Sequence, residues 1–118
     1  MILTKGKTKH VDCLDQLLPI RDALDVISGK WKVLILTSIM RDNRRFGEIQ
    51  RSIPKINPKV LSKELKDMEE HQLINRIVDE NNPGLIEYIA TDYSHSLKRV
   101  MMELYSWGVS HRKQILGK

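Results

Sequence analysis

The sequence predicts a mainly α-helical (α+β) domain with one small antiparallel β-hairpin, on three observations. Apolar residues recur at helical spacing over most of the 118 residues. Two segments rich in β-branched residues, 73–78 and 85–89, flank a polar turn at 79–84. Proline, asparagine and glycine stand where helices begin or end. A chain of this length has room for one domain, which we place at residues 12–118 after a flexible basic tail at residues 1–11.

The first half of the domain is predicted to contain three helices. Pro19 fits the first turn of a helix, so we expect a helix over residues 19–28 that Gly29 ends. The next helix, over about residues 30–40, has too broad an apolar surface for a surface helix and is predicted to be the central core helix. A short helix begins at Phe46 and ends where residue 53 precedes a proline.

The second half begins with the strongest helix start in the chain. Asn57 is a good N-cap and Pro58 a good first helical residue, so we expect a helix over about residues 57–70. The hairpin follows at about 73–90, and Thr91 can cap a final helix over about 92–115. Three helices, a fourth after a turn, a hairpin and a last helix are the order of a winged helix-turn-helix domain, in which the hairpin is the wing.

The positive charge of the chain is concentrated in 26 residues, 41–66, which span the helix-turn-helix. They contain eight basic residues and three acids, a net charge of +5, whereas the other 92 residues contain twelve of each sign. A local basic excess on helices is typical of a surface that lies against nucleic acid phosphates.

The second helix of a helix-turn-helix lies in the major groove, and its outer side chains contact base edges and phosphates. A lysine-rich face is by itself most often only a solvated face; here the local charge, the Asn-Pro turn and the hairpin all favour DNA. We also expect two arginines before the short helix to clamp a phosphate with its first backbone amides. The candidate DNA-binding residues are Arg44, Arg45, Lys55, Asn57, Lys59, Ser62, Lys63, Lys66 and, at the wing tip, Asn81 and Asn82.

The segment 25–36, Asp-Val-Ile-Ser-Gly-Lys-Trp-Lys-Val-Leu-Ile-Leu, resembles the signature of the HxlR-type regulators, a MarR-like branch of bacterial winged-helix transcription factors. Four further segments agree with it, and the resemblance covers about residues 19–107. It implies a homodimer that binds operator DNA and joins through its N- and C-terminal helices. The four segments are 45–49, 53–56, 60–69 and 86–88.

Two residues depart from the family pattern. Leu85 stands where members usually have a basic residue in the wing. Leu18 stands before Pro19, where many members have a cysteine that in some of them senses oxidants. Cys13 lies five residues before Leu18, so the resemblance carries a redox role over to it only loosely; the alternative is a buried or inert thiol.

A homodimer would place its two recognition helices in successive major grooves, which requires a near-palindromic operator. The alternative is a winged-helix protein-interaction module whose basic helix docks an acidic partner. A small-molecule or oxidant effector of unknown identity is a further expectation; Trp31, Tyr105 and Trp107 line its pocket or belong to the core. The predicted dimer interface consists of Leu14, Leu17, Leu97, Val100, Met101, Leu104 and Trp107.

The residue types argue against catalysis. The four histidines are scattered without metal-ligand spacing, and the chain has no glycine-rich phosphate loop. A single cysteine excludes an intramolecular disulfide framework and any multi-cysteine zinc site. We therefore expect no enzyme, no cofactor and no metal. The lack of a signal peptide or a membrane-length apolar run predicts a cytoplasmic protein without a membrane partner.

Overall fold

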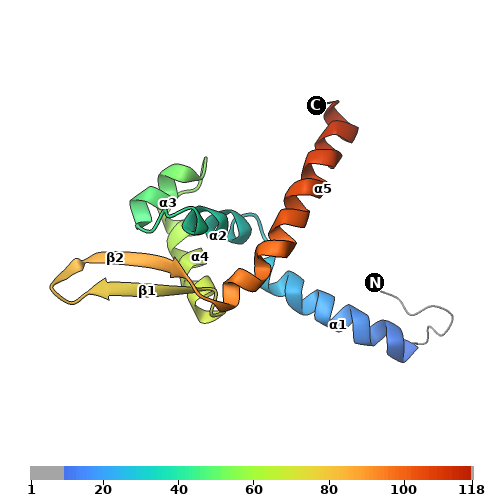
Figure 1. Cartoon of the computed structure of the whole chain (residues 1–118), viewed down its shortest axis with the longest axis horizontal. Coiled ribbons are helices and arrows are strands. Elements are labelled where there is room, and N and C mark those ends of the chain that lie inside the picture. The colour runs from blue at the N-terminus through green and yellow to red at the C-terminus, as the bar shows by residue number, and fades with distance from the viewer. Residues whose placement is uncertain (1–9, 118) are drawn as a thin grey trace.

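The computed structural model describes the backbone of residues 10–117 and the side chains of residues 15–117. In Figure 1, α2, α3, α4 and the hairpin form one body, from which α1 and α5 project as separate arms. The predicted mainly α fold with an antiparallel hairpin is confirmed. The elements are α1 (His10–Ile27), α2 (Lys32–Met40), α3 (Phe46–Ser52), α4 (Pro58–Glu70), β1 (Ile74–Asp79), β2 (Asn82–Ala90), the 3₁₀ helix η1 (Tyr93–Leu97) and α5 (Lys98–Leu116).

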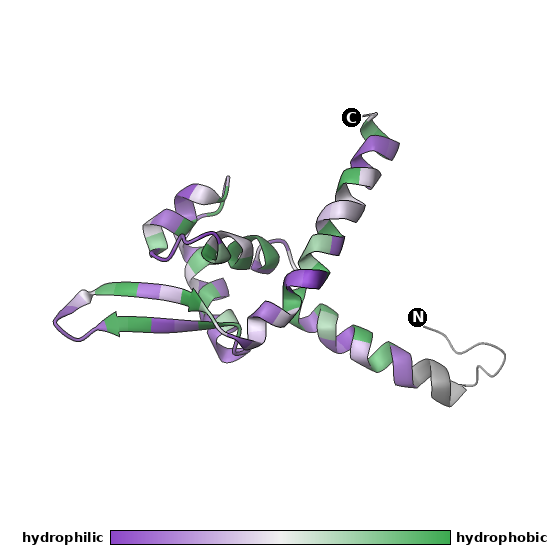
Figure 2. Cartoon of the chain, viewed as in Figure 1, coloured by the Kyte–Doolittle hydropathy of each residue, from purple (hydrophilic) through white to green (hydrophobic). Residues whose placement is uncertain are grey.

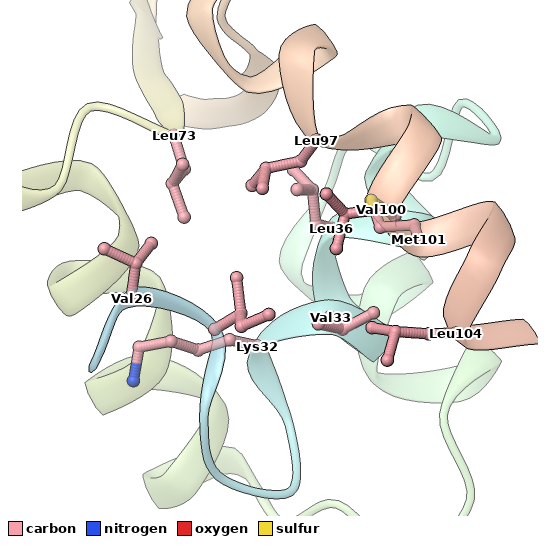
Figure 3. Close-up of a pocket in the computed structure, with 10 residues that line it drawn as sticks. Val26, Lys32, Val33, Leu36, Leu73, Leu97, Val100, Met101 and Leu104 are labelled. Carbon is pink, nitrogen blue, oxygen red and sulfur yellow. The ribbon is translucent and has the colours of Figure 1, made fainter. Parts of the chain in front are cut away.

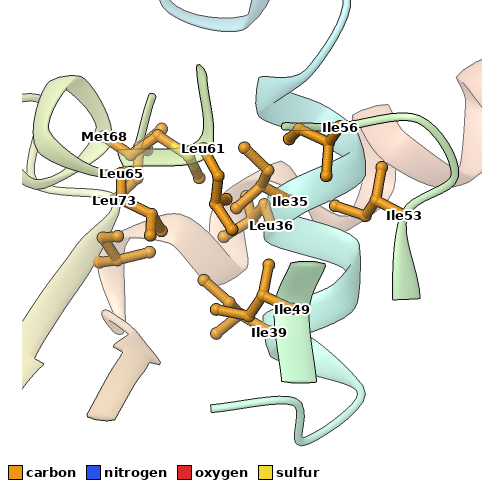
Figure 4. Packing of buried hydrophobic residues seen from close by; sticks show 11 residues of the cluster. Ile35, Leu36, Ile39, Ile49, Ile53, Ile56, Leu61, Leu65, Met68 and Leu73 are labelled. Carbon is orange, nitrogen blue, oxygen red and sulfur yellow. The ribbon is translucent and has the colours of Figure 1, made fainter. Parts of the chain in front are cut away.

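The hydrophobic core lies where α2, α3 and α4 meet the first residues of the hairpin (Figure 4). The central helix predicted over residues 30–40 is confirmed, because α2 supplies three of the core side chains. Each of α3 and α4 buries only one side, which leaves its opposite side free for solvent or a ligand. The core residues are Ile35, Leu36, Ile39, Ile49, Ile53, Ile56, Leu61, Leu65, Met68, Leu73 and Ile74.

Helix α1 differs from the helix predicted over residues 19–28. It begins at His10, inside the range assigned to the basic tail, and Pro19 lies within it. The side chain of Pro19 is exposed, so the ring disturbs no packed neighbour, and its missing N–H removes one helical hydrogen bond. The predicted end is confirmed: Gly29 has a φ of +92°. The rest of the predicted tail, residues 1–9, lies outside the described part of the chain.

The two strands pair antiparallel in the order the sequence predicted, but the turn is shorter than expected. The register runs from Ile74 opposite Ala90 to Val78 opposite Ile86 and then becomes irregular, with Asp79 opposite Asn82. Three residues of the expected turn and second strand, 83–85, therefore form an irregularity on β2, which accommodates a proline because this is an edge strand.

The base of the hairpin is closed by Thr91. Its hydroxyl donates to the carbonyl of Gln72 at 2.7 Å. The same oxygen accepts from the backbone N–H of Ser94 at 3.0 Å. Thr91 therefore binds the first turn of η1 from the residue before its N-cap, which is Asp92. Helix η1 is a short 3₁₀ turn that precedes α5, whereas the sequence led us to expect one continuous helix from residue 92.

The overall shape is extended. The radius of gyration is 17.6 Å, whereas a compact chain of this length has a radius of about 13 to 14 Å. No residue of α5 is buried, and Figure 2 shows apolar residues along both α1 and α5. No helix of the described residues is long and apolar enough to cross a membrane.

Candidate nucleic-acid interface

Helix α4 begins at the predicted residue and buries the predicted apolar side. The side-chain oxygen of Asn57 accepts from the backbone N–H of Val60 at 2.8 Å, and Pro58 is the first helical residue. Leu61, Leu65 and Met68 are the buried residues of the helix, and none is more than 2% exposed. At about 100° per residue, these three positions fix which side of α4 faces away from the core.

The outward side of α4 carries the predicted basic face. Lys59, Ser62 and Lys66 are exposed, and the side chain of Lys63 is 73% exposed. The ammonium group of Lys63 lies 3.6 Å from a carboxylate oxygen of Asp67. This pair is a weak one, because solvent screens the exposed lysine. Of the ion pairs between described residues, none involves Lys59 or Lys66.

An ion pair ties α4 to α2. Lys32 Nζ lies 2.6 Å from Glu64 Oε1 and 3.8 Å from Asp67 Oδ2, and the side chains of Lys32 and Glu64 are only 14% and 16% exposed. In Figure 3 the Lys32 stem runs beside apolar side chains and its nitrogen points toward α4. The sequence suggested no reason for an acid at the edge of the apolar side of α4. The pair supplies it, because Glu64 neutralises a lysine from the neighbouring helix.

The turn between α3 and α4 is anchored by two core residues. Ile53 and Ile56 are each 5% exposed, so the residues between them are held close to the core. Lys55 has a φ of +69°, a left-handed conformation that is uncommon for a residue other than glycine. Its side chain is exposed beside the start of α4. The turn therefore places Lys55 and Asn57 at one end of the basic face.

The arginines before α3 have their own backbone amides occupied. Glu48 Oε1 accepts from the backbone N–H groups of Arg44 and Arg45 at 3.0 and 3.1 Å. These hydrogen bonds hold the pKa of Glu48 below its usual value. A phosphate therefore cannot use these two amides without displacing the carboxylate. Both side chains are exposed. The guanidinium group of Arg44 lies 3.5 Å from a carboxylate oxygen of Asp42, in an exposed and therefore weak ion pair.

The wing is attached to the same segment. The backbone N–H of Tyr88 donates to the carbonyl of Arg44 at 2.7 Å, which fixes the arginines beside β2. Leu85, where the family pattern has a base, lines a surface hollow of about 250 Å³ together with Arg45. Arg45 therefore brings a positive charge close to Leu85, the position that is usually basic in the family pattern. Asp79 and Glu87 line the same hollow and oppose that charge.

The wing tip presents the two predicted asparagines, Asn81 and Asn82, both exposed. The backbone N–H of Asn81 donates to Asp79 Oδ1 at 2.9 Å, which orders the turn. Sequence reasoning missed Arg76, the one basic residue of the hairpin, which is exposed in the middle of β1. The sequence did contain a signal for Arg76, because it is the single basic residue among the acids of residues 74–90.

The residues predicted for the dimer interface divide into two groups. Leu97 and Met101 are half-buried and pack against the core of their own chain. Together with Val100 and Leu104 they line a cavity of about 10 Å³ where α1, α2 and α5 meet (Figure 3), which is too small for a ligand. The second group lies on α1 and α5 outside that cavity and is exposed: Leu17 at 57% and Trp107 at 67%.

Three aromatic residues were predicted for an effector pocket or the core. Trp31 is partly buried against the core, with Lys30 Nζ 5.0 Å from its ring centre. Trp107 stacks on His111 at 4.8 Å on the exposed part of α5, and Tyr105 is 74% exposed. The three side chains do not share a pocket. The side chains of Leu14 and Cys13 lie outside the described residues.

Sequence comparison relates the chain to known regulators. The family described as HxlR-like helix-turn-helix matches residues 26–115. The chain is 34% identical to the uncharacterized HTH-type transcriptional regulator YtcD of Bacillus subtilis, over 85% of this chain and 79% of that protein. It is 36% identical to the uncharacterized HTH-type transcriptional regulator BH0655 of Halalkalibacterium halodurans, over 92% of this chain and 93% of that protein.

Among solved structures, the redox regulator HypR in its reduced form is similar. It superposes with a TM-score of 0.76 at 29% identity, over 85% of this chain and 99% of that chain. The crystal structure of YtcD gives a TM-score of 0.72 at 36% identity, over 78% of this chain and 94% of that chain. The family match covers the basic face, the wing and most of α5, so this chain belongs to the HxlR-like helix-turn-helix family and is a transcriptional regulator of that family.

Proposed function

We propose that the protein binds DNA sequence-specifically as a homodimer on a near-palindromic operator. The observation that carries the proposal is the outer face of α4. Its exposed lysines and Ser62 face away from a core that fixes the orientation of the helix. Lysine suits phosphate binding, and serine both donates and accepts at base edges.

The surroundings of α4 support the same function. Lys55 and Asn57 lie at one end of the basic face, and the exposed arginines before α3 extend the positive surface toward the wing. The wing contributes Arg76, Asn81 and Asn82 beside three acids. We therefore expect α4 to carry most of the affinity and the wing to contribute less, because acids beside a phosphate weaken binding.

The dimer is supported by the arms. An isolated helix is marginal in water, and most helical stability comes from packing of an apolar side. On α5, however, the large apolar side chains are not packed within the chain: Met102, Tyr105 and Trp107 are 69%, 74% and 67% exposed. A second copy of the chain would cover such residues, and a two-fold axis would present two α4 helices to DNA about one helical turn apart.

The test is a binding titration on operator fragments selected from the source genome. Lys59→Glu/Lys66→Glu should weaken binding about 100-fold or more, since like charges placed together cost several kcal/mol. The matched control is Lys113→Glu, an exposed lysine at the far end of α5. Wild-type affinity should fall about 10³-fold between roughly 50 and 200 mM salt if about six phosphates are contacted.

A folded charge-reversal variant that keeps full operator affinity would remove the outer face of α4 from the site. A wild-type protein that shifts no duplex DNA and elutes as a monomer would instead support the protein-interaction module with an acidic partner. The unfolding transition of each variant, measured in urea, separates loss of contact from loss of fold.

The redox role of Cys13 is untested, and we propose the alternative, an inert thiol. HypR, one of the similar proteins, is a redox regulator, but Leu18 occupies the cysteine position of the family pattern in this chain. We expect Cys13→Ser to change operator affinity less than about twofold, and diamide to change it no more, as for an inert thiol. Loss of binding on diamide treatment in the wild type, with no loss in Cys13→Ser, would show that this thiol senses oxidants.

A further inference from the structure

One acidic residue of α4 lies between the interior of the protein and the outer face of the helix. Asp67 Oδ2 is 3.8 Å from Lys32 Nζ of α2 and 3.6 Å from Lys63 Nζ of the outer face. The side chain of Asp67 is 34% exposed, whereas that of Lys32 is 14% and that of Lys63 is 73% exposed. A single carboxylate oxygen is therefore shared by an enclosed lysine and an exposed one.

The enclosed lysine does not neutralise Asp67 by itself. Lys32 Nζ lies closer to Glu64 Oε1, at 2.6 Å, so its charge is compensated first by that carboxylate. One ammonium group faces two carboxylates, which leaves one negative charge on the side of Asp67. Lys63, one helical turn before Asp67, supplies the charge that balances it.

The two partners of the Lys63–Asp67 pair differ in reach. Lysine carries its ammonium group on a flexible four-carbon stem. Aspartate has a single methylene group, and the carboxylate of Asp67 also faces Lys32 on its inner side. The carboxylate therefore stays beside α4 while the ammonium group of Lys63 extends toward a ligand. Any group that binds Lys63 must then tolerate a carboxylate close by.

The other lysines of the outer face lack this restraint. Lys59 and Lys66 are exposed, and neither belongs to an ion pair within the described part of the chain. A phosphate that binds either of them displaces no carboxylate from it. The three lysines of one face are therefore not equivalent as ligands for DNA.

The acceptors that DNA offers differ in charge. A phosphate is an anion, so a phosphate bound to Lys63 would lie close to the carboxylate of Asp67, and like charges placed together at an interface weaken binding. The major-groove edge of guanine presents two neutral acceptors, N7 and O6, which lysine binds. An ammonium group shared between Asp67 and a guanine edge brings no second anion to the carboxylate.

We propose that Asp67 is a specificity-determining residue that acts through Lys63, because it directs the ammonium group to a guanine edge and away from the phosphates. The proposal rests on the DNA binding proposed above and gives the lysines separate tasks. Lys59 and Lys66 bind phosphates and supply the salt-dependent affinity, whereas Lys63 reads a base. Asp67 is a positioning residue, since it sets the contact of Lys63 and makes none of its own.

The test measures two quantities, the slope of log affinity against log salt concentration and the ratio of operator affinity to non-specific affinity. Asp67→Asn keeps the shape of the side chain and removes its charge, so Lys63 becomes able to bind a phosphate. On non-specific duplex DNA the slope should steepen by about one phosphate contact, and affinity should rise about fivefold. The ratio should fall by about the same factor.

The complementary variant is Lys63→Met. It should leave the salt slope unchanged on both kinds of DNA and lower the ratio about tenfold, because a base contact is lost and no phosphate contact is. In the Lys63→Met chain, the further change Asp67→Asn should alter the ratio less than about twofold, since its effect requires the lysine. The matched control is Glu70→Gln, which removes a charge from an exposed residue at the end of α4.

The outcomes separate this proposal from the DNA-binding function. An equal fall of the ratio in Glu70→Gln, or in the Lys63→Met background, would show that Asp67 acts by general charge and overturn the proposal. A Lys63→Met variant that loses about one phosphate contact from the slope and keeps its ratio would place Lys63 on a phosphate, with the same consequence. In each of these cases DNA binding stands. A wild-type protein that shifts no duplex DNA contradicts the function and the proposal together.

Discussion

Two regions of the chain differ in how much of their apolar surface is buried. One is the body formed by α2, α3 and α4, and the other is the pair of arms formed by α1 and α5. The body buries eleven apolar side chains with the start of the hairpin, whereas α5 buries none. On the body, the exposed side of α4 is polar and basic. On the arms, the exposed residues include leucines, methionines and aromatic residues.

The difference indicates two kinds of binding surface. A charged face on a rigid body suits a polyanion such as DNA. The lysines of that face stay solvated when the polyanion dissociates, so the fold does not depend on it. An apolar surface on helices with little support of their own suits an obligate partner, whose packing completes the fold. In the proposed homodimer, each chain would hold its DNA-facing side fixed while its arms pack against the second copy.

The largest expected difference between body and arms is in stability. Leu61→Ala in the core should lower the free energy of unfolding by about 2–5 kcal/mol at every protein concentration. Leu24→Ala on α1 should cost less than about 1 kcal/mol in dilute protein and more as concentration rises, because the proposed homodimer would bury that side chain. Urea unfolding at several concentrations measures both. A concentration-independent loss at Leu24 would contradict the contrast.

A smaller effect is expected where α2 holds α4. Lys32→Met leaves Glu64 largely enclosed without its partner and should cost about 1–3 kcal/mol of stability, and Lys32→Met/Glu64→Leu should recover most of it. Operator affinity should fall while its salt dependence stays unchanged, since Lys32 does not reach a phosphate. The matched control, Lys66→Met, should lower the salt slope by about one phosphate contact. An equal change of slope in both variants would give Lys32 a direct DNA contact.

The cap of α4 should contribute less again. Asn57→Ala removes the acceptor for the Val60 amide and should destabilise the protein by about 1 kcal/mol. Asn57→Ser keeps an acceptor at the N-cap and is the control, expected to retain most of the stability. Lower operator affinity of Asn57→Ser than of the wild type, at equal stability, would show that the Asn57 amide also contacts DNA.

The smallest effect concerns Glu48 and is visible only through pH. Because the native pKa lies below the usual value of 4.5, the carboxylate stabilises the native state fully above that pH and loses its contribution as the pH falls through the native pKa. Glu48→Gln should therefore lower the melting temperature at about pH 7, and the gap should narrow below pH 4.5. Glu80→Gln in the wing turn is the control. A gap that is independent of pH would contradict the hydrogen-bonded carboxylate.

Local sequence signals correctly predicted those elements whose first or last residues are marked by capping residues or whose apolar spacing is clear. Asn57-Pro58 located α4, Gly29 located the end of α1, and apolar spacing identified α2 as the core helix. The start of α1 was missed because a proline usually opens a helix, and here it lies in the middle of one. The wing turn was predicted too long, because an irregular pairing on β2 depends on which residues face each other.

The sequence by itself determined the fold class, the basic side of α4 and the family, since these depend on periodicity, caps and motif spacing. Only the tertiary structure decided that Glu48 occupies the amides of Arg44 and Arg45, that Lys32 pairs with Glu64, and that Asp67 lies between Lys32 and Lys63. These are contacts between side chains or segments whose distance and direction follow from packing. The sequence gives the sign of each charge, but which group it pairs with depends on which side chains the fold places within a few ångströms of it.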